Sequence, residues 1–132
     1  MEEIIEKACK ELDLKWKKKE KKFEIHVIEK TTVTVEREDN NITLFANIME
    51  CPREKREDIF VHLMKGNFLG KGTGGAAAGL DKDEKNLTLL LTLPYEIGSQ
   101  QFKAVIEDFI NYIFFWREQI EKLYNKLTEK NA

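Results

Sequence analysis

Residues 63–120 read LMKGNFLGKGTGGAAAGLDKDEKNLTLLLTLPYEIGSQQFKAVIEDFINYIFFWREQI. Glycine enters positive φ without steric cost, so the glycines in 66–75 predict the end of a helix. Two strands should follow, at 75–80 and at 87–93, separated by the charged turn 81–86. Nowhere does this passage bring together a nucleophile, a base and an orienting group. The pattern therefore favours a protein that binds another protein over an enzyme.

A long helix closes this passage. Ser99 is the only serine in the chain, and its side-chain oxygen is placed to cap a helix that runs to about Leu127. Apolar residues recur along this helix at a spacing of three and four, which predicts one buried face. The residues of this stripe are Phe102, Ile106, Phe109, Ile113, Trp116, Ile120, Leu123 and Leu127.

Upstream, the pattern changes from helix to strand and back to helix. Apolar residues at helical spacing predict a short first helix over 4–12. Alternation with period two predicts strands at 23–27, 33–36 and 42–49. Proline suits a first helical position, so a second helix should run over 52–68. The predicted order is αβββαββα, an α+β fold with a twisted antiparallel five-stranded sheet packed with three helices.

The composition is that of one globular domain. At 132 residues the chain is long enough for its own core, so we expect a single domain over 1–132, with 128–132 as a disordered tail. The net charge of −2, from 22 basic and 24 acidic side chains, predicts no nucleic-acid partner. The sequence has no leader pattern and no apolar run long enough to span a bilayer. We therefore expect a cytoplasmic protein without stable membrane insertion.

The cysteines and histidines predict no metal site. Cys9 and Cys51 stand far apart in the chain without a CxxC motif, and neither His26 nor His62 has ligands at metal-binding spacing. Reduced thiols and structural or surface histidines are the simplest interpretation. We expect no catalytic residue, no metal and no cofactor.

Residues 70–75, GKGTGG, satisfy the pattern GxGxxG. A dinucleotide site places such glycines between a strand and the helix whose N-terminus receives the pyrophosphate. Here a helix precedes and a strand follows. The context therefore favours a flexible connector.

Six lysines lie within 15–22, interrupted by Trp16 and Glu20. Lysines with an aromatic residue could bind a single-stranded nucleic acid. A strand edge protected by lysine explains the cluster more simply, because exposed edges need such protection against aggregation. Which partner these lysines contact stays open.

Two elements carry more apolar residues than one buried face requires. The strand at 42–49 places Phe45 and Met49 on the face opposite its main apolar row. The second helix carries a broad apolar stripe in a short element. The chain's own helices could cover both. An apolar surface that binds a partner is favoured, because exposed patches on soluble monomers are normally small.

These features, in their order and spacing, resemble the class I type III secretion chaperones, the Tir chaperone family. The resemblance rests on residues 63–68 (LMKGNF), similar to the family's LLxxN at a helix end, and on the small-residue strand that closes in 79–81. It rests also on the strand 87–93 and on the aromatic helix with Trp116. The resemblance implies a bacterial homodimer built around the second helix. The expected interface residues are Ile59, Phe60, Leu63, Met64 and Phe68.

The same resemblance implies a secreted effector whose N-terminal segment binds in extended form, without enzyme activity. Such a segment would add a strand to an exposed sheet edge and insert alternate side chains into apolar pockets. We assign effector binding to the sheet residues Phe23, Ile25, Val33, Val35, Phe45 and Met49. Alternation does not settle which sheet face binds the effector. A non-secretory dimeric adaptor of the same fold, a heterodimer, and contacts with the secretion apparatus stay open as alternatives.

Overall fold

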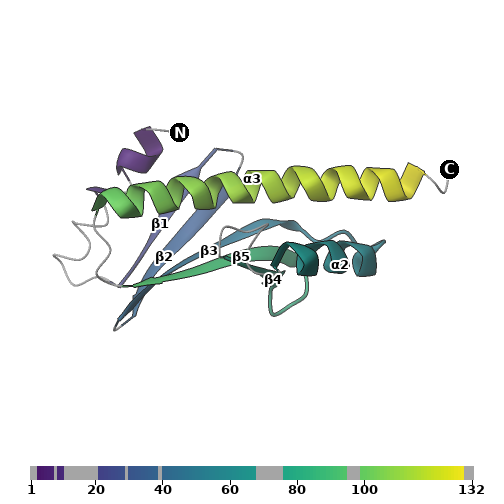
Figure 1. The fold of residues 1–132 in the computed structure, drawn as a ribbon, viewed down its shortest axis with the longest axis horizontal. Helices are drawn as coiled ribbons and strands as arrows, with labels where there is room; N and C mark the ends of the chain where they lie inside the picture. The colour runs from purple at the N-terminus through teal and green to yellow at the C-terminus, as the bar shows by residue number, and fades with distance from the viewer. Residues whose placement is uncertain are drawn as a thin grey trace.

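A computed structural model describes most of the chain. The described residues are 3–7, 9–10, 21–28, 30–38, 40–67, 76–94 and 99–129. Residues 3–7 and 9–10 are helical. The elements that follow are β1 (Lys22–Val27), β2 (Thr31–Glu38), β3 (Asn41–Glu50), α2 (Arg56–Asn67), β4 (Ala77–Leu80), β5 (Asn86–Pro94) and α3 (Ser99–Glu129) (Figure 1). The predicted α+β architecture is confirmed.

The strands form one five-stranded antiparallel sheet in the order β1-β2-β3-β5-β4. At its centre, Leu44 of β3 lies opposite Val35 of β2 and Leu91 of β5. Side chains alternate between the two faces of a strand, and β1 is buried at every second residue. One face of the sheet therefore belongs to the core, and β1 and β4 are its edges.

Helix α3 lies along the core face of the sheet (Figure 1). Its predicted apolar stripe is confirmed, because the stripe residues from Phe102 to Ile120 are buried and Leu123 and Leu127 are half-buried. Full burial of one such side chain contributes about 1.5–3 kcal/mol. The buried stripe holds α3 against the sheet, and the helix continues past the strands toward its C-terminal end (Figure 1).

Arg117 ties the middle of α3 to the sheet. Its Nε donates a hydrogen bond to the carbonyl oxygen of Ile48 at 2.8 Å, and its Nη2 donates to Oγ1 of Thr31 at 3.0 Å. The guanidinium also lies 5.4 Å from the ring centroid of Phe114. Bonds from a charged donor are stronger than neutral ones. Arg117 therefore fixes the position of the helix relative to β3 and to the start of β2.

Helix α2 packs against the C-terminal half of α3 through a glycine. A Cβ atom at position 66 would overlap Cζ2 of Trp116. The indole cannot easily move aside, because Trp116 is only 3% exposed. His62 packs edge-on against the same indole, with ring centroids 5.5 Å apart. The missing side chain at Gly66 thus sets how closely the two helices approach.

Gly66→Ala should destabilise the protein. At an open helical position, alanine would be more favourable than glycine by about 1 kcal/mol. Here the added methyl overlaps a buried indole, so we expect a loss of about 1–3 kcal/mol in the free energy of unfolding, measured with urea. Gly79→Ala is the control, since its Cβ would meet only Oγ1 of Thr88 at 3.8 Å. Equal stability of the two variants would contradict the close approach.

Helix α2 begins at Arg56, so the predicted start at Pro52 is wrong. Lys55 has a φ of 62°, a left-handed conformation that interrupts any helical run from Pro52. The Arg56 guanidinium instead donates hydrogen bonds to the carbonyl oxygens of Pro52 and Glu84. Because Glu84 lies in the turn between β4 and β5, this contact with a distant segment left no signal in the local pattern.

Asp81 organises the turn between β4 and β5. Its Oδ1 accepts hydrogen bonds from the backbone N–H groups of Lys85 at 2.8 Å and of Asn86 at 3.0 Å, and its Oδ2 accepts one from Nδ2 of Asn86 at 2.9 Å. The two hydrogen bonds from Asn86 lower the pKa of Asp81 most. Desolvation raises this pKa by less than either of these bonds lowers it, and the hydrogen bond and charge of Lys85 lower it further. The ionised carboxylate therefore holds β4 in register with β5.

This shift in pKa predicts a pH dependence. A carboxylate whose pKa is lowered by folding stabilises the fold above its unfolded pKa of about 3.9, and that contribution is lost as the pH falls through the folded pKa. Below about pH 4, the melting temperature of the wild type should therefore fall more steeply than that of Asp81→Asn. Circular dichroism melts across this range measure the effect. Asp83→Asn, in the same turn, should behave as the wild type, and three identical profiles would contradict the role of Asp81.

Several predictions concern residues outside the described part. These are most of the lysine cluster in 15–22, the glycine connector and Phe68. Helix α3 continues through Thr128 and Glu129, two residues into the predicted tail, where Oγ1 of Thr128 donates to the carbonyl oxygen of Tyr124 at 2.9 Å. Within the described residues, no helix has the length and apolar character needed to cross a membrane.

Candidate protein-binding surfaces

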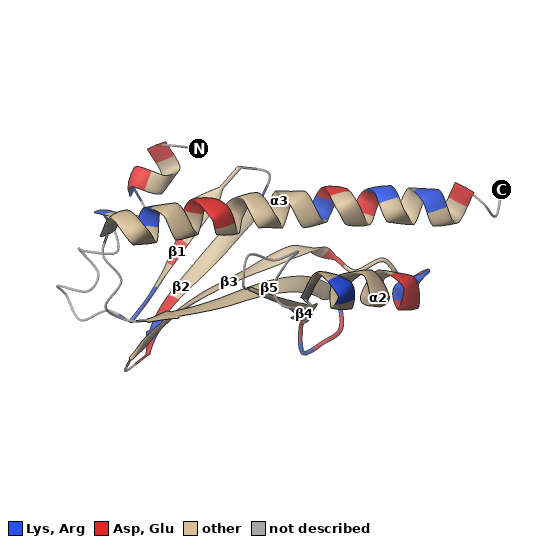
Figure 2. Cartoon of the chain, in the orientation of Figure 1, with Lys and Arg blue, Asp and Glu red and all other residues tan. Residues whose placement is uncertain are grey.

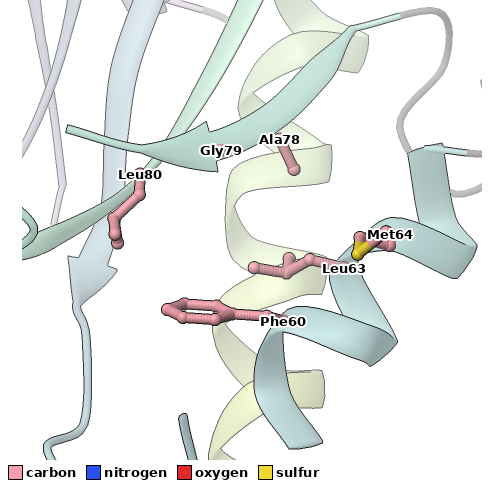
Figure 3. Close-up of a pocket in the computed structure, with 6 residues that line it drawn as sticks. All are labelled: Phe60, Leu63, Met64, Ala78, Gly79 and Leu80. Atoms are coloured by element: carbon pink, nitrogen blue, oxygen red, sulfur yellow. The ribbon is translucent and has the colours of Figure 1, made fainter. Parts of the chain in front are cut away.

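The first candidate surface lies where α2 meets β4. It encloses a hollow of about 220 Å³ (Figure 3). Met64 is 70% exposed at its rim, and no charged side chain lines it. We call it the α2–β4 surface, defined by Phe60, Leu63, Met64, Ala78, Gly79 and Leu80.

Small residues on β4 make this hollow possible. Figure 3 shows Leu63 of α2 and Ala78 of β4 pointing into the space between the two elements. Ala78 fills little of this space because its side chain is a single methyl group, and the backbone of Gly79 completes the β4 side of the lining. Among the described strands, β4 is also an edge of the sheet, and a sheet edge beside apolar residues can pair with another chain. The α2–β4 surface thus has the features of a protein interface.

The second candidate surface is the sheet face away from α3. Phe45 of β3 and Leu90 of β5 lie directly opposite each other, and both are exposed. Thr34 and Ala77 continue this row onto β2 and β4. Figure 2 shows almost no charge along β3 and β5, and β5 contains no charged residue. We call Phe45 and Leu90 the open-face pair.

The third candidate surface is the outer edge of β1. The N–H of Arg37 donates to the carbonyl oxygen of Lys21 at 2.7 Å, so these two residues form a hydrogen-bonded pair of the β1–β2 ladder. Hydrogen-bonded and non-hydrogen-bonded pairs alternate along an antiparallel ladder. In such a ladder, the backbone groups of Lys22, Glu24 and His26 point away from β2. Among the described residues, no strand pairs with β1 on that side. This edge could therefore accept an additional strand.

Comparison with known families gives these surfaces a context. The model of the Tir chaperone protein (CesT) family matches residues 3–117, which include all the strands, α2 and most of α3. The chain belongs to the Tir chaperone family. The resemblance drawn from the sequence is therefore confirmed.

A curated relative of this Tir chaperone family member is a protein of Chlamydia pneumoniae, CPj0713/CpB0740. The two are 30% identical over 79 residues, which cover 59% of this chain and 60% of the relative. The chain thus spans about 60% of the length of the curated relative that it matches.

Solved structures share the fold of this family member. The ExoU–SpcU heterodimeric complex from the type III secretion system of Pseudomonas aeruginosa matches with a TM-score of 0.58 and 9% identity, over 76% of this chain and 79% of that chain. The HopA1–SchA chaperone–effector complex matches with a TM-score of 0.56 and 11% identity, over 72% and 73%. YbjN of E. coli, a proposed transcription regulator, matches with a TM-score of 0.63 and 14% identity, over 79% and 78%. At these identities the likeness shows the fold alone.

The residues predicted for the dimer interface divide between core and surface. Ile59 is fully buried and Leu63 is only 4% exposed, so both pack mainly within the chain. Phe60 and Met64 reach the α2–β4 surface, and Phe68 lies outside the described residues. Sequence reasoning missed the contribution of β4. The run of small residues at 76–79 was the signal that could have revealed it, because small residues allow another chain to approach closely.

The residues predicted for effector binding also divide. The side chains of four of them, Phe23, Ile25, Val33 and Val35, are buried in the core beneath α3, so they are not available on the folded surface. Phe45 lies on the opposite, open face, and Met49 is half-buried after the register shift in β3. The assignment of the first four to effector contact is therefore not retained. Leu90, opposite Phe45, is the open-face residue that the sequence did not indicate.

The described residues bring together no catalytic set. Burial raises the pKa of the Cys51 thiol, and Arg56 opposes this effect only in part. A protonated thiol is a poor nucleophile. His62 is packed against Trp116, and no three His, Cys, Asp or Glu side chains in the described part of the chain are grouped to hold a metal ion.

Proposed function

We propose that this chain is a type III secretion chaperone that binds the N-terminal segment of one or more secreted effectors. The observation that carries this proposal is the family match over residues 3–117. The shared fold with a chaperone–effector complex and with a complex from a type III secretion system supports it. Binding keeps the segment non-globular, soluble and ready for export.

The surfaces suit an extended polypeptide. The outer edge of β1 offers backbone donors and acceptors, as strand addition requires. The open-face pair offers apolar contact on a face with little charge. Such binding needs no chemical step, so the chain acts as a binding protein and not as an enzyme, and it acts in the bacterial cytoplasm before export.

The working unit is a homodimer formed through the α2–β4 surface. Met64 and Phe60 place apolar area around a hollow that the described residues leave unfilled. A second copy would close this hollow and cover the β4 edge. Contacts of the dimer with the secretion apparatus would follow from the same role.

A second candidate function is a non-secretory adaptor of the same fold. The structural likeness to YbjN favours it, since that protein is described as a regulator and not as a secretion chaperone. The adaptor would use the same dimer and bind a partner that stays inside the cell.

Affinity capture from the native bacterium distinguishes the two functions. The tagged chain is purified at gentle salt, the associated proteins are identified by mass spectrometry, and each is then expressed again without its N-terminal segment. A secreted protein that binds only through this segment supports the chaperone. Partners that are never exported, bound through folded domains, would favour the adaptor instead.

A further inference from the structure

One side of α2 carries exposed apolar residues beyond the α2–β4 surface. Val61 is 50% exposed and Met64 is 70% exposed, although both are large apolar residues. The opposite side of the helix is buried through Ile59 and Leu63, so the exposed pair is not part of the core of the single chain. Apolar residues that stay exposed together are typical of a protein interface. Val61 belongs to none of the three surfaces described above.

Charged residues flank this exposed apolar part symmetrically. Glu57, Val61 and Lys65 follow one another at intervals of four residues, so they lie along one side of the helix, and all three are exposed. We call these three residues the α2 line. Figure 2 shows an uncharged middle of α2 between acidic residues near its start and a basic residue near its end. The α2 line is therefore acidic, apolar and basic in turn, with Val61 at its midpoint.

The two charges of the α2 line are open to a second molecule. Within the described part of the chain, neither Glu57 nor Lys65 forms an ion pair. Asp58 is exposed and adds negative charge beside Glu57. Arg56 keeps its positive charge, but its guanidinium donates to the carbonyl oxygens of two residues outside the helix, which hold it beside the turn between β4 and β5. The charge on the exposed line at the start of α2 is therefore that of Glu57.

A second copy of this chain is complementary to the α2 line when the two helices run antiparallel. If they cross at Val61, Glu57 of each copy lies beside Lys65 of the other, because both positions are four residues from the crossing. A parallel pair would instead place like charges together. A two-fold dimer makes each contact twice, so the antiparallel arrangement forms two ion pairs. Met64 also lies at the rim of the α2–β4 surface, so the same copy can reach that hollow.

We infer that two copies of this chain pair their α2 helices antiparallel, with Val61 at the crossing, and that Glu57 and Lys65 select an identical copy as the partner. This inference rests on the proposed function, in which the chain acts as a homodimer. A related chain without these two charges would lose both ion pairs, so a mixed dimer would be less stable than the homodimer. The apolar contacts thus give affinity, and the two charges give specificity.

Two cysteine variants test the orientation on the full chain. Packed helices lie about 8–10 Å apart, with Cα atoms about 2.3 Å from each axis, so two residues at a crossing come within the roughly 7 Å between Cα atoms that a disulfide requires. In a Cys9→Ser background, which removes the more exposed thiol, Val61→Cys should form a covalent dimer under mild oxidation, seen on a non-reducing gel. Glu57→Cys is the control. Its two copies would lie about 12 Å apart along antiparallel helices, so this variant should not be crosslinked.

Charge-reversal variants test the specificity. Glu57→Lys and Lys65→Glu should each weaken the homodimer about tenfold or more, because two ion pairs become two like-charge contacts. An equimolar mixture of the two variants should form a heterodimer as tight as the wild type, measured by sedimentation with one variant labelled. In 1 M NaCl, where the Debye length is about 3 Å, these differences should shrink. Lys22→Glu and Glu24→Lys, exposed on β1 at the other edge of the sheet, are the controls and should dimerise as the wild type does.

Three results would overturn the inference. Crosslinking of Glu57→Cys as readily as Val61→Cys would indicate parallel helices. A mixture of the charge variants that forms no heterodimer would exclude the pairing of Glu57 with Lys65. A dimeric wild type in which neither cysteine variant is crosslinked would mean that the copies meet elsewhere. The proposed chaperone function survives each of these failures if the bacterial capture still yields an effector bound through its N-terminal segment.

Discussion

Met64→Asp should convert the proposed homodimer into a single chain of 15.5 kDa. Met64 is 70% exposed in the isolated chain, so the substituted chain should still fold. In the dimer, the new carboxylate would be buried without a partner, which costs about 3–5 kcal/mol. Light scattering at micromolar concentration measures the change in mass, and circular dichroism checks that the fold is retained.

Ile28→Asp is the matched control for this experiment. Ile28 is also a large, exposed apolar residue, but it directly follows β1 and lies outside the α2–β4 surface. Its replacement should leave the mass of the dimer unchanged. A Met64→Asp protein that keeps the mass of the wild type would refute the assigned interface.

Leu63→Asp cannot serve for the same purpose. Leu63 is 4% exposed and packs in the core of the single chain. A carboxylate there would destabilise the monomer, so loss of the dimer would have two explanations. Met64 separates assembly from folding, because it lines the same hollow but is 70% exposed in the single chain.

Trp116→Ala should have the largest effect on folding. Truncation of a buried tryptophan removes about 3–5 kcal/mol from the free energy of unfolding. Trp116 is 3% exposed, receives the edge contact of His62 and lies directly against Gly66. The urea midpoint should therefore fall strongly, or the chain should fail to fold.

Phe115→Ala provides the comparison within the same turn of α3. Phe115 is 46% exposed, although its ring also contacts Trp116 at a centroid distance of 5.7 Å. Its loss should cost much less than the loss of Trp116. Similar urea midpoints for the two variants would mean that α2 does not depend on the indole. Because Trp116 packs against Gly66 and His62 of α2, its replacement should also loosen the packing of α2 against β4 at the α2–β4 surface.

Helix α3 and the strands could be predicted from the sequence because their periodicities are long and regular. The apolar spacing from Phe102 to Ile120 is helical throughout, and the alternation around Ile25 and Leu44 is typical of strands. The start of α2 could not be predicted in this way. It depends on the left-handed Lys55 and on the bond between Arg56 and Glu84, which joins segments far apart in the chain.

The candidate surfaces were harder to predict, because their definition requires knowing what covers each face. Helical spacing separates Ile59 and Leu63 from Phe60 and Met64, but only the position of Trp116 shows which pair points inward. Alternation likewise separates Val35 from Phe45. Only the register with β2 and β5 places Phe45 opposite Thr34 and Leu90, on the face that α3 leaves open.

Family membership, the two apolar surfaces and the free edge of β1 lead to one central claim: two copies of this chain hold one effector segment in extended form. Native mass spectrometry of the chain purified together with the N-terminal segment of its captured partner tests this claim most directly. We expect a complex of two chains with one segment, whose amide hydrogens exchange slowly only where the segment pairs with β1. A complex of one chain with a folded partner would contradict the account.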